Sequence, residues 1–449
     1  MSEEPIAAIV LAAGKGTRMK SALPKVLHSI AGQPMVRHVL AAAMDLDPER
    51  LVVVVGPAMD AVERAVSPHP TAVQTAQAGT GDAVRVGLGR LDGFGQGTVL
   101  VLFGGDPLIR SATLRRLVAA REAGAGVVVL GFRAEDPAGY GRLVLDGSGA
   151  LQAIVEDRDA TENQRAIDLC NAGVMAIDAS RLPGLIARVG NDNAKGEYYL
   201  TDIVALARDD GVPCVVVEAE ETELMGVDSR ADLARAEALW QSARRARAMD
   251  EGATLVDPQT VYFAHDTVLG RDVTIGPNVV FGPGAEIADN VEIRAFSHIE
   301  GARVASGAVI GPFARLRPGT EVGEEAHIGN FVELKNTVMG KGAKANHLAY
   351  VGDSEVGARA NIGAGTITCN YDGFGKHKTI IGEGAFIGSN AALVAPVTIG
   401  KSAIVGAGST ISRDVPDDAL SIERSKQIDL AGRAKLFREE RAAAKAKKG

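Results

Sequence analysis

The sequence contains few aromatic residues and few cysteines. Phe, Trp and Tyr make up 4% of the 449 residues, whereas Gly is abundant with 53 residues. The three cysteines, Cys170, Cys214 and Cys369, are widely spaced, odd in number and without a CxxC pair. Disulfide frameworks and zinc sites need patterned cysteines, so neither is indicated and a reducing compartment is expected.

Long apolar runs and strong net charge are also absent. No stretch reaches the roughly 20 apolar residues that span a membrane, and the first ten residues lack the basic start of a secretory signal. The net charge of -8 is mild and argues against a nucleic-acid partner. These absences predict a soluble cytoplasmic enzyme without a membrane partner, and the length predicts two or three domains.

Aliphatic residues recur at every sixth position between about Thr267 and Val415. Neither the 3.6-residue period of a helix nor the two-residue period of a strand fits this spacing. A hexapeptide β-helix does fit, because each repeat forms one face of a triangular coil and stacks its aliphatic side chain on the turn below. Three registers are present: Ile275, Phe281, Ile287, Ile293, Ile299; Val304, Ile310, Leu316, Val322, Ile328, Leu334; and Ile381, Ile387, Leu393, Ile399, Val405, Ile411.

A β-sandwich with evenly spaced turns is the alternative fold for this region. The many in-frame aliphatic residues favour the coil. The region resembles the hexapeptide acyltransferases, and this resemblance implies a left-handed parallel β-helix, since parallel crossovers in general are right-handed.

The first half of the chain alternates apolar runs with helix-like segments. Runs at Ile6 to Ala13, Leu51 to Val55, Val99 to Phe103 and Val127 to Gly131 predict buried parallel strands. Helix-like segments lie between them, for example at Met35 to Ala43 and Ala112 to Ala123. This alternation predicts an α/β domain whose ligands bind at the carboxyl ends of the strands.

The first of these runs leads into a glycine-rich turn, Gly14-Lys15-Gly16-Thr17-Arg18-Met19, with Lys25 shortly after it. Glycines allow backbone N–H groups to approach phosphate oxygens closely. Neither the Walker P-loop nor the dinucleotide fingerprint fits this turn. The pattern LxxGxGTRM followed by Pro-Lys resembles the signature of sugar-1-phosphate nucleotidyltransferases, which implies a Rossmann-like domain.

Further motifs extend the resemblance to the whole chain. They resemble those of the bacterial family that combines N-acetylglucosamine-1-phosphate uridyltransferase with glucosamine-1-phosphate acetyltransferase. The motifs are Gln74, Gly79-Thr80-Gly81, Gly139-Tyr140-Gly141-Arg142, Ile154-Val155-Glu156, Asn171-Ala172-Gly173 and Gly196-Glu197-Tyr198-Tyr199-Leu200-Thr201-Asp202.

The resemblance implies a nucleotidyltransferase domain at 1–228, a linker helix at 229–250 and an acetyltransferase β-helix with a tail at 251–449. A capping-box pattern at Ser229 to Asp232 supports the helix start. The basic tail from Ser425 to Gly449 is expected to be a solvated helix or a disordered end.

The resemblance also implies the roles of residues in the first domain. Lys25 and Arg18 would be catalytic cations. The UTP and UDP-N-acetylglucosamine contacts would be Leu11, Ala12, Ala13, Gly14, Lys25, Gln74, Gly79, Thr80, Phe103, Gly104, Gly141, Glu156, Asn171 and Asp228.

Uridyl transfer needs charge neutralisation rather than a general base, because the attacking phosphate is already ionised at neutral pH. The implied Mg²⁺ needs oxygen ligands, usually one or two carboxylates with phosphates and water. Here the sequence departs from the family pattern: Gly105 occupies the expected aspartate position and Asp106 follows one residue later. A shift of one residue turns a strand side chain to the opposite face. Asp228 stands where the family has Asn, so Asp106 and Asp228 are the predicted metal ligands.

Polar residues gather where the six-residue frame is interrupted, between Leu334 and Ile381. Departures from a repeat indicate function. By resemblance, Arg317, Lys335, Tyr350 and Asn361 would bind glucosamine 1-phosphate, and His347 would be the base that deprotonates the sugar amine. The acetyl-CoA groove would be formed by Ala364, Asn370, Tyr371, Ser389, Ala407 and Arg424.

The predicted function is therefore acetyl transfer from acetyl-CoA to glucosamine 1-phosphate, followed by uridyl transfer from UTP, to give UDP-N-acetylglucosamine. The family resemblance also implies a homotrimer. Two alternatives remain. One is an acetyltransferase whose uridyltransferase site is impaired by Gly105. The other is a nucleotide-binding scaffold that uses the coil only for assembly.

Overall fold

The computed structural model describes residues 4–193 and 195–447. The outer bounds of the predicted domains, residues 1 and 449, and Lys448 of the basic tail lie outside the described residues. Two compact units are present: residues 1–247 with 263–265, and residues 248–262 with 266–449. No helix in the described ranges combines the length and apolar character of a membrane span.

The first unit is built on a twisted nine-stranded sheet in which β11, β7, β10, β6, β1, β4 and β5 lie side by side. All of these strands run parallel except β10. The strands are β1 (Ile6–Leu11), β4 (Arg50–Val55), β5 (Thr71–Val73), β6 (Thr98–Phe103), β7 (Val127–Arg133), β8 (Arg142–Leu145), β9 (Leu151–Val155), β10 (Leu169–Asp178) and β11 (Cys214–Glu218). The α/β architecture predicted from alternating segments is confirmed.

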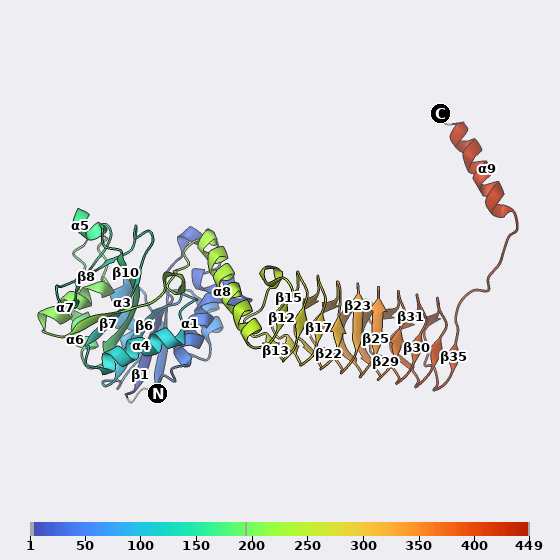
Figure 1. Cartoon of the computed structure of the whole chain (residues 1–449), viewed down its shortest axis with the longest axis horizontal. Coiled ribbons are helices and arrows are strands. Elements are labelled where there is room, and N and C mark those ends of the chain that lie inside the picture. The colour runs from blue at the N-terminus through green and yellow to red at the C-terminus, as the bar shows by residue number, and fades with distance from the viewer. Residues whose placement is uncertain (1–3, 194, 448–449) are drawn as a thin grey trace. The chain divides into compact units, whose positions relative to one another are not determined.

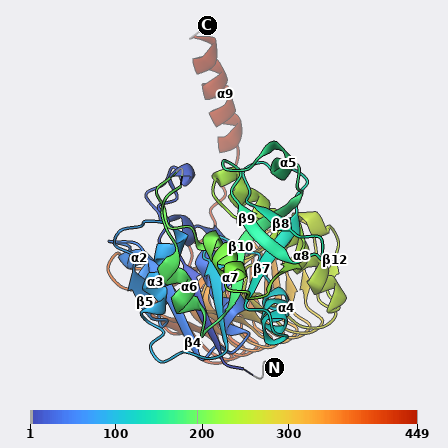
Figure 2. The same cartoon turned by 90° about the vertical axis from the view of Figure 1, so that its left-hand side faces the viewer.

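Helices cover both faces of this sheet. One core lies between the sheet and α1, α2 and α4, and the other between the sheet and α3, α6 and α7. Figure 2 shows α6 and α7 on one side of β7 and β10, and α4 on the other. The helices are α1 (Met35–Met44), α2 (Asp60–Val66), α3 (Thr80–Leu88), α4 (Ser111–Glu122), α5 (Glu162–Arg165), α6 (Leu182–Arg188), α7 (Ile203–Asp209), α8 (Arg230–Asp250) and, in the second unit, α9 (Arg433–Ala446).

Helix α8 begins as its sequence predicts. The Asp232 carboxylate accepts a hydrogen bond from the Ser229 N–H at 2.8 Å, and the Ser229 hydroxyl accepts one from the Asp232 N–H at 3.2 Å. Two otherwise unpaired donors at the helix start are thus satisfied.

The second unit is a coil of short parallel strands from β12 (Thr254–Leu255) to β35 (Leu420–Ser421), stacked like rungs in Figure 1. Ile275 pairs with Ile293, and Ile293 with Ile310, so three six-residue repeats complete one turn. All the aliphatic residues of the three predicted registers are buried. The hexapeptide coil is therefore confirmed and the β-sandwich alternative is excluded.

The interruption of the six-residue frame does not interrupt the coil. Strands β23 (His327–Asn330), β24 (Glu333–Met339), β25 (Lys344–His347), β26 (Tyr350–Val356), β27 (Asn361–Ile362) and β28 (Ile367–Cys369) continue the stack. Ile362 then pairs with Ile387, 25 residues along, whereas Ile387 pairs with Val405, 18 residues along. The extra length is a surface loop at residues 370–377, which the coil accommodates at one corner.

Candidate functional site

A cavity of about 520 Å³ opens at the carboxyl end of β1 in the first unit. Nine of the predicted nucleotide contacts line it. They come from the turn after β1, the segment before α3, the end of β6 and the short 3₁₀ turn at Lys25–Leu27. The lining includes Leu11, Ala12, Ala13, Gly14, Lys25, Gln74, Gly79, Thr80 and Phe103. Gly104 lies just behind, where its N–H donates to the Leu11 carbonyl at 2.9 Å.

Contacts between the loop at Ala78–Gly79 and the loop at Tyr198 hold one wall of this cavity. Gly79 has φ of 114°, and a Cβ there would lie 2.6 Å from the Tyr198 carbonyl oxygen, so the position requires glycine. The Tyr198 N–H donates to the Ala78 carbonyl at 2.8 Å. Gln74 is buried, and its amide nitrogen donates to the Gly79 carbonyl at 2.9 Å. Gln74 therefore shapes this loop as well as facing the cavity.

Two cations converge on one carboxylate beside the cavity. Lys25 Nζ lies 2.9 Å from Asp228 Oδ1, and Arg18 Nη2 lies 2.8 Å from Asp228 Oδ2. The Lys25 side chain is 20% exposed and the Arg18 side chain 72% exposed, so Arg18 is free to move toward a ligand while Lys25 is held in place. Residues distant in sequence thus form a charged group beside the cavity that Lys25 lines.

Gly105 and Asp106 face different neighbours. A Cβ on Gly105 would lie 2.8 Å from Lys25 Nζ, so a side chain at this position would point at the ammonium group. Asp106 instead places Oδ1 3.3 Å from where a Cβ on Gly226 would be. Burial raises the pKa of Asp106 to about 7; Lys25 lowers this pKa and Asp228 raises it further. Lys25 therefore takes its counter-charge from Asp228.

The predicted sugar contacts Gly141, Glu156 and Asn171 come together from three segments. A Cβ on Gly141 would lie 3.6 Å from both Asn171 Cβ and Glu156 Oε1. The Asn171 N–H donates to the Gly141 carbonyl at 2.8 Å. Glu156 also lines a cavity of about 440 Å³ together with Arg18 and Lys195. Burial raises the pKa of the Glu156 carboxyl, and the nearby Lys195 lowers it.

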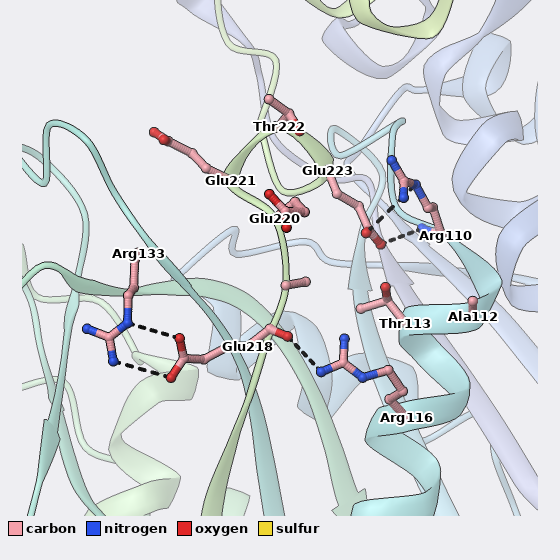
Figure 3. A pocket seen from close by; sticks show the side chains of 11 residues that line it. Arg110, Ala112, Thr113, Arg116, Arg133, Glu218, Glu220, Glu221, Thr222 and Glu223 are labelled. Carbon is pink, nitrogen blue, oxygen red and sulfur yellow. Dashed lines mark hydrogen bonds and ion pairs between the residues drawn. The ribbon is translucent and has the colours of Figure 1, made fainter. Parts of the chain in front are cut away.

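Another cavity, of about 670 Å³, contains none of the predicted site residues (Figure 3). It is lined by arginine and glutamate side chains that pair with one another. Arg133 Nε lies 3.2 Å from Glu218 Oε2, and the Glu223 carboxylate accepts from the Arg110 N–H at 3.0 Å at the start of α4. Internal ion pairs thus already occupy the positions that a charged ligand would need.

One row along the coil contains five of the predicted acetyl-transfer residues, namely His347, Ala364, Ser389, Ala407 and Arg424. Asn330 and His347 are register partners on β23 and β25. The pairings of β27, β30 (Phe386–Ile387) and β33 (Ile404–Val405) continue this register through Ala364, Ser389 and Ala407. Arg424 completes the row, where its Nη1 donates to the Ala407 carbonyl at 2.7 Å. With turns about 4.8 Å apart, the row extends about 20 Å from His347 to Arg424.

His347 is oriented by its neighbour in the row. Its Nδ1 lies 2.6 Å from Asn330 Oδ1, and the ring is exposed. An amide oxygen can only accept a hydrogen bond, so Nδ1 carries the proton and donates it. In the neutral imidazole, Nε2 is then the nitrogen that can accept a proton, as a general base requires.

Two more predicted substrate contacts, Lys335 and Asn370, meet at Asp353. Lys335 Nζ lies 3.7 Å from Asp353 Oδ2, and the Asn370 amide donates to the same oxygen. The Asn370 amide also lies 3.4 Å from the Tyr350 hydroxyl. Arg317 pairs with Glu333 at 2.8 Å, and Glu333 is the register partner of Tyr350. Two carboxylates that the sequence analysis did not identify, Asp353 and Glu333, therefore hold three of the predicted contacts.

Lys376 is a cation that the sequence analysis missed. It lies in the loop at 370–377. The pKa of Lys376 is lowered first by its side-chain contact with Lys335, and further by the charge of Lys335 and by desolvation. Two neighbouring lysines of like charge are a candidate site for an anion. The signal available in the sequence was the insertion itself, which carries a lysine beside Asn370 and Tyr371. Of the two other predicted contacts, Asn361 pairs with Lys344 on β25, and Tyr371 is exposed with its hydroxyl donating to the Gly373 carbonyl at 2.7 Å.

Comparisons with known proteins match both units. The family described as "MobA-like NTP transferase domain" matches residues 8–169, and "Bacterial transferase hexapeptide (six repeats)" matches residues 266–301 and 378–413. The chain is 59% identical over 453 residues to "Bifunctional protein GlmU" of Paramagnetospirillum magneticum, with all of both chains covered. It is 61% identical to the protein of the same name from Rhodospirillum rubrum, covering 96% of this chain and 97% of the relative.

A third relative, "Bifunctional protein GlmU" of Bradyrhizobium sp., is 54% identical with 96% of each chain covered. These matches extend through the nucleotide cavity, the charged group at Lys25 and the row headed by His347. An acetyltransferase-only chain and a scaffold gain no support from them. With identity this high over essentially its whole length, the chain belongs to the GlmU family of bifunctional uridyltransferase and acetyltransferase enzymes.

Proposed function

We propose that the residues described above carry the two transfers of this enzyme as follows. Acetyl transfer converts glucosamine 1-phosphate and acetyl-CoA into N-acetylglucosamine 1-phosphate and CoA. Uridyl transfer then converts that product and UTP into UDP-N-acetylglucosamine and pyrophosphate. The observation that carries the assignment is the pairing of Lys25 and Arg18 with Asp228 beside the nucleotide cavity, because it supplies the charge that Gly105 lacks.

His347 is the base of the acetyl transfer. Its Nε2 takes the proton from the sugar ammonium, and the free amine forms a bond to the acetyl carbon. The C–S bond breaks, the attacking nitrogen loses its second proton to form the amide, and the thiolate takes that proton to leave as the CoA thiol. The row from Ala364 to Arg424 suits a long extended ligand whose reactive thioester lies at the His347 end.

Lys25 and Arg18 neutralise the phosphates during uridyl transfer. An oxygen of the sugar phosphate attacks the α-phosphorus of UTP, and the bond to pyrophosphate breaks. Gly141, Glu156 and Asn171 orient the sugar. Backbone N–H groups of the turn after β1 receive phosphate oxygens.

The donor atoms present fit a magnesium ion that is shared with the substrate. Among the described residues no cluster of three or more His, Cys, Asp or Glu side chains could hold a metal alone. Asp106 and Asp228 both interact with Lys25, and two carboxylates with phosphate oxygens are a usual set for Mg²⁺. Bound there, Mg²⁺ would neutralise charge on the triphosphate; Asp228 is the more exposed ligand.

The order of the two steps can be tested by omitting substrates. With N-acetylglucosamine 1-phosphate, UTP and Mg²⁺, the purified chain should release pyrophosphate without acetyl-CoA. With glucosamine 1-phosphate in its place, release should be slow until acetyl-CoA is added. Equal rates with both sugars would contradict the proposed order, because Glu156 and Asn171 would then not distinguish the acetamido group.

Lys376→Ala should weaken binding of glucosamine 1-phosphate. One charge-assisted contact to the sugar phosphate is lost, so the KM for this substrate should rise about tenfold, corresponding to about 1.4 kcal/mol. The KM for acetyl-CoA should not change. Lys378→Ala is the matched control, because the Lys378 ammonium pairs with Glu355 instead. If both variants raise the KM equally, Lys376 has no specific role in phosphate binding.

We also propose that the chain assembles as a homotrimer through its coils and works in the cytoplasm, where UTP and acetyl-CoA are made. Support for self-association comes from an exposed stack of Phe296, Phe313 and Phe331, whose ring centroids lie 4.9 and 5.1 Å apart. Exposed apolar patches of this kind are typical of interfaces. Sedimentation equilibrium should give three times the chain mass; a monomer at micromolar concentration would contradict the trimer.

A further inference from the structure

Arg142 is a buried charged side chain close to the sugar contacts. It is the first residue of β8, and it is 2% exposed. Arginine is seldom buried to this extent without fixed partners. Its Nη1 donates to the Tyr140 carbonyl, and its Nη2 lies 3.1 Å from Asp157 Oδ1 and 3.5 Å from the Arg165 carbonyl. Within the described chain its Nε has no hydrogen-bond partner.

The partners of Arg142 are the immediate neighbours of residues assigned to the sugar. Tyr140 precedes Gly141, and Asp157 follows Glu156. One guanidinium therefore ties the loop that carries Gly141 to the turn that carries Glu156. The strand pairing adds the third segment, because Arg142 lies opposite Cys170, next to Asn171. Arg142 thus contacts the segments of all three sugar contacts, those of Gly141 and Glu156 through its side chain and that of Asn171 through its strand pairing.

The planar fork of arginine suits this task. Its two terminal nitrogens donate in fixed directions, so the distance between the two loops is set by one rigid group. Lysine would keep the charge but could not hold both partners in the same geometry. The guanidinium is too buried to touch a substrate in the neighbouring cavity, whereas Glu156 and Asp157 line that cavity.

We propose that Arg142 is a positioning residue for the sugar phosphate in uridyl transfer. It sets the separation of Gly141 and Glu156 and so determines the affinity for N-acetylglucosamine 1-phosphate, while the UTP cavity does not depend on it. This inference rests on the proposed assignment of Gly141, Glu156 and Asn171 to the sugar.

The test is the KM of each uridyl-transfer substrate in the full-length Arg142→Lys enzyme. The KM for N-acetylglucosamine 1-phosphate should rise about tenfold or more, and the KM for UTP should stay within about twofold. Acetyl transfer by the same preparation should be unchanged because it uses the second unit, and the unchanged KM for UTP reports that the first unit is folded. Arg133→Met is the matched control, because it removes an arginine from strand β7, which pairs with β10 and β11. Arg133 pairs with Glu218 (Figure 3) and with Asp168, and its loss should change neither KM.

Two further variants separate the possible failures. Asp157→Ala removes one partner of Arg142 from a more exposed position and should reproduce the selective KM rise even if Arg142→Lys does not fold. Glu156→Gln tests the sugar assignment itself. If Glu156→Gln raises the KM for the sugar but Arg142→Lys and Asp157→Ala do not, the positioning role is wrong. If Glu156→Gln also has no effect, the proposed sugar site is wrong. Equal rises in both KM values would indicate a merely structural role and overturn the inference.

Discussion

His347→Ala should reduce acetyl transfer by a factor of about 10² to 10⁴, the usual contribution of a positioned general base. A sugar ammonium cannot attack a thioester until it loses a proton, and in the described structure His347 lies at the end of the row assigned to acetyl-CoA. The rate of CoA thiol release from acetyl-CoA and glucosamine 1-phosphate measures the effect. Pyrophosphate release from UTP and N-acetylglucosamine 1-phosphate should be unchanged, because it uses the other unit.

Asn330→Ala provides the graded control for this result. The bond of 2.6 Å between His347 Nδ1 and Asn330 Oδ1 fixes the tautomer and the ring orientation but takes no part in the transfer. Its removal should cost about tenfold, near the value of one hydrogen bond. Acetyl transfer that survives His347→Ala undiminished would rule out His347 as the base. A loss in Asn330→Ala as large as that in His347→Ala would instead assign a direct role to Asn330.

Asp228→Asn should reduce uridyl transfer by about 10²-fold while acetyl transfer stays unchanged. The substitution keeps the size of the side chain and removes the charge that balances Lys25 and Arg18. It also removes the more exposed of the two proposed Mg²⁺ ligands. The Mg²⁺ concentration that gives half-maximal pyrophosphate release should therefore rise. Direct titration of the protein with Mn²⁺, followed by electron paramagnetic resonance in the presence of UTP, gives a readout independent of activity.

The double variant Gly105→Asp, Asp228→Asn restores the charge from the opposite segment. The Val227 N–H donates to the Gly105 carbonyl at 2.9 Å, so the two positions are adjacent in space. A carboxylate at 105 would point at Lys25 Nζ, which can move aside because it ends a flexible side chain. Uridyl transfer should recover to within about tenfold of the starting enzyme, since coupled neighbours are not additive. Failure to recover would show that Asp228 acts through more than its charge.

Much of the fold could be predicted from the sequence. A repeat of six residues admits few structures, and each in-frame aliphatic side chain from Ile275 to Ile411 lies inside the coil as expected. The six-residue spacing was expected to break at a functional site, but the break reflects turns of unequal length in a continuous coil. Turns around His347 contain 17 residues, as between Asn330 and His347, and the loop at 370–377 is inserted without breaking the stack. The six-residue spacing of aliphatic residues is therefore lost in this region, although the strands of the coil still pair turn on turn.

The candidate site was predictable only where its residues lie in motifs. Lys25 and Gly79 stand in short motifs that resemble a known signature, whereas Asp353 and Arg142 act through partners on other segments of the chain. Asp353 joins Lys335 to Asn370 across successive turns of the coil. Arg142 joins segments that the β8 and β9 hairpin brings together. The spacing of residues along the sequence does not predict such pairings, so they were found only in the structure.

The measurement that tests the central claim most directly is a paired assay on the purified protein. Acetyl-CoA, glucosamine 1-phosphate, UTP and Mg²⁺ are supplied together, and free thiol and pyrophosphate are followed as separate signals. The account predicts both products, with pyrophosphate appearing after a lag while N-acetylglucosamine 1-phosphate accumulates. Thiol release without pyrophosphate, even when N-acetylglucosamine 1-phosphate is added directly, would contradict it, because Asp228 and Asp106 would then not compensate for the glycine at position 105.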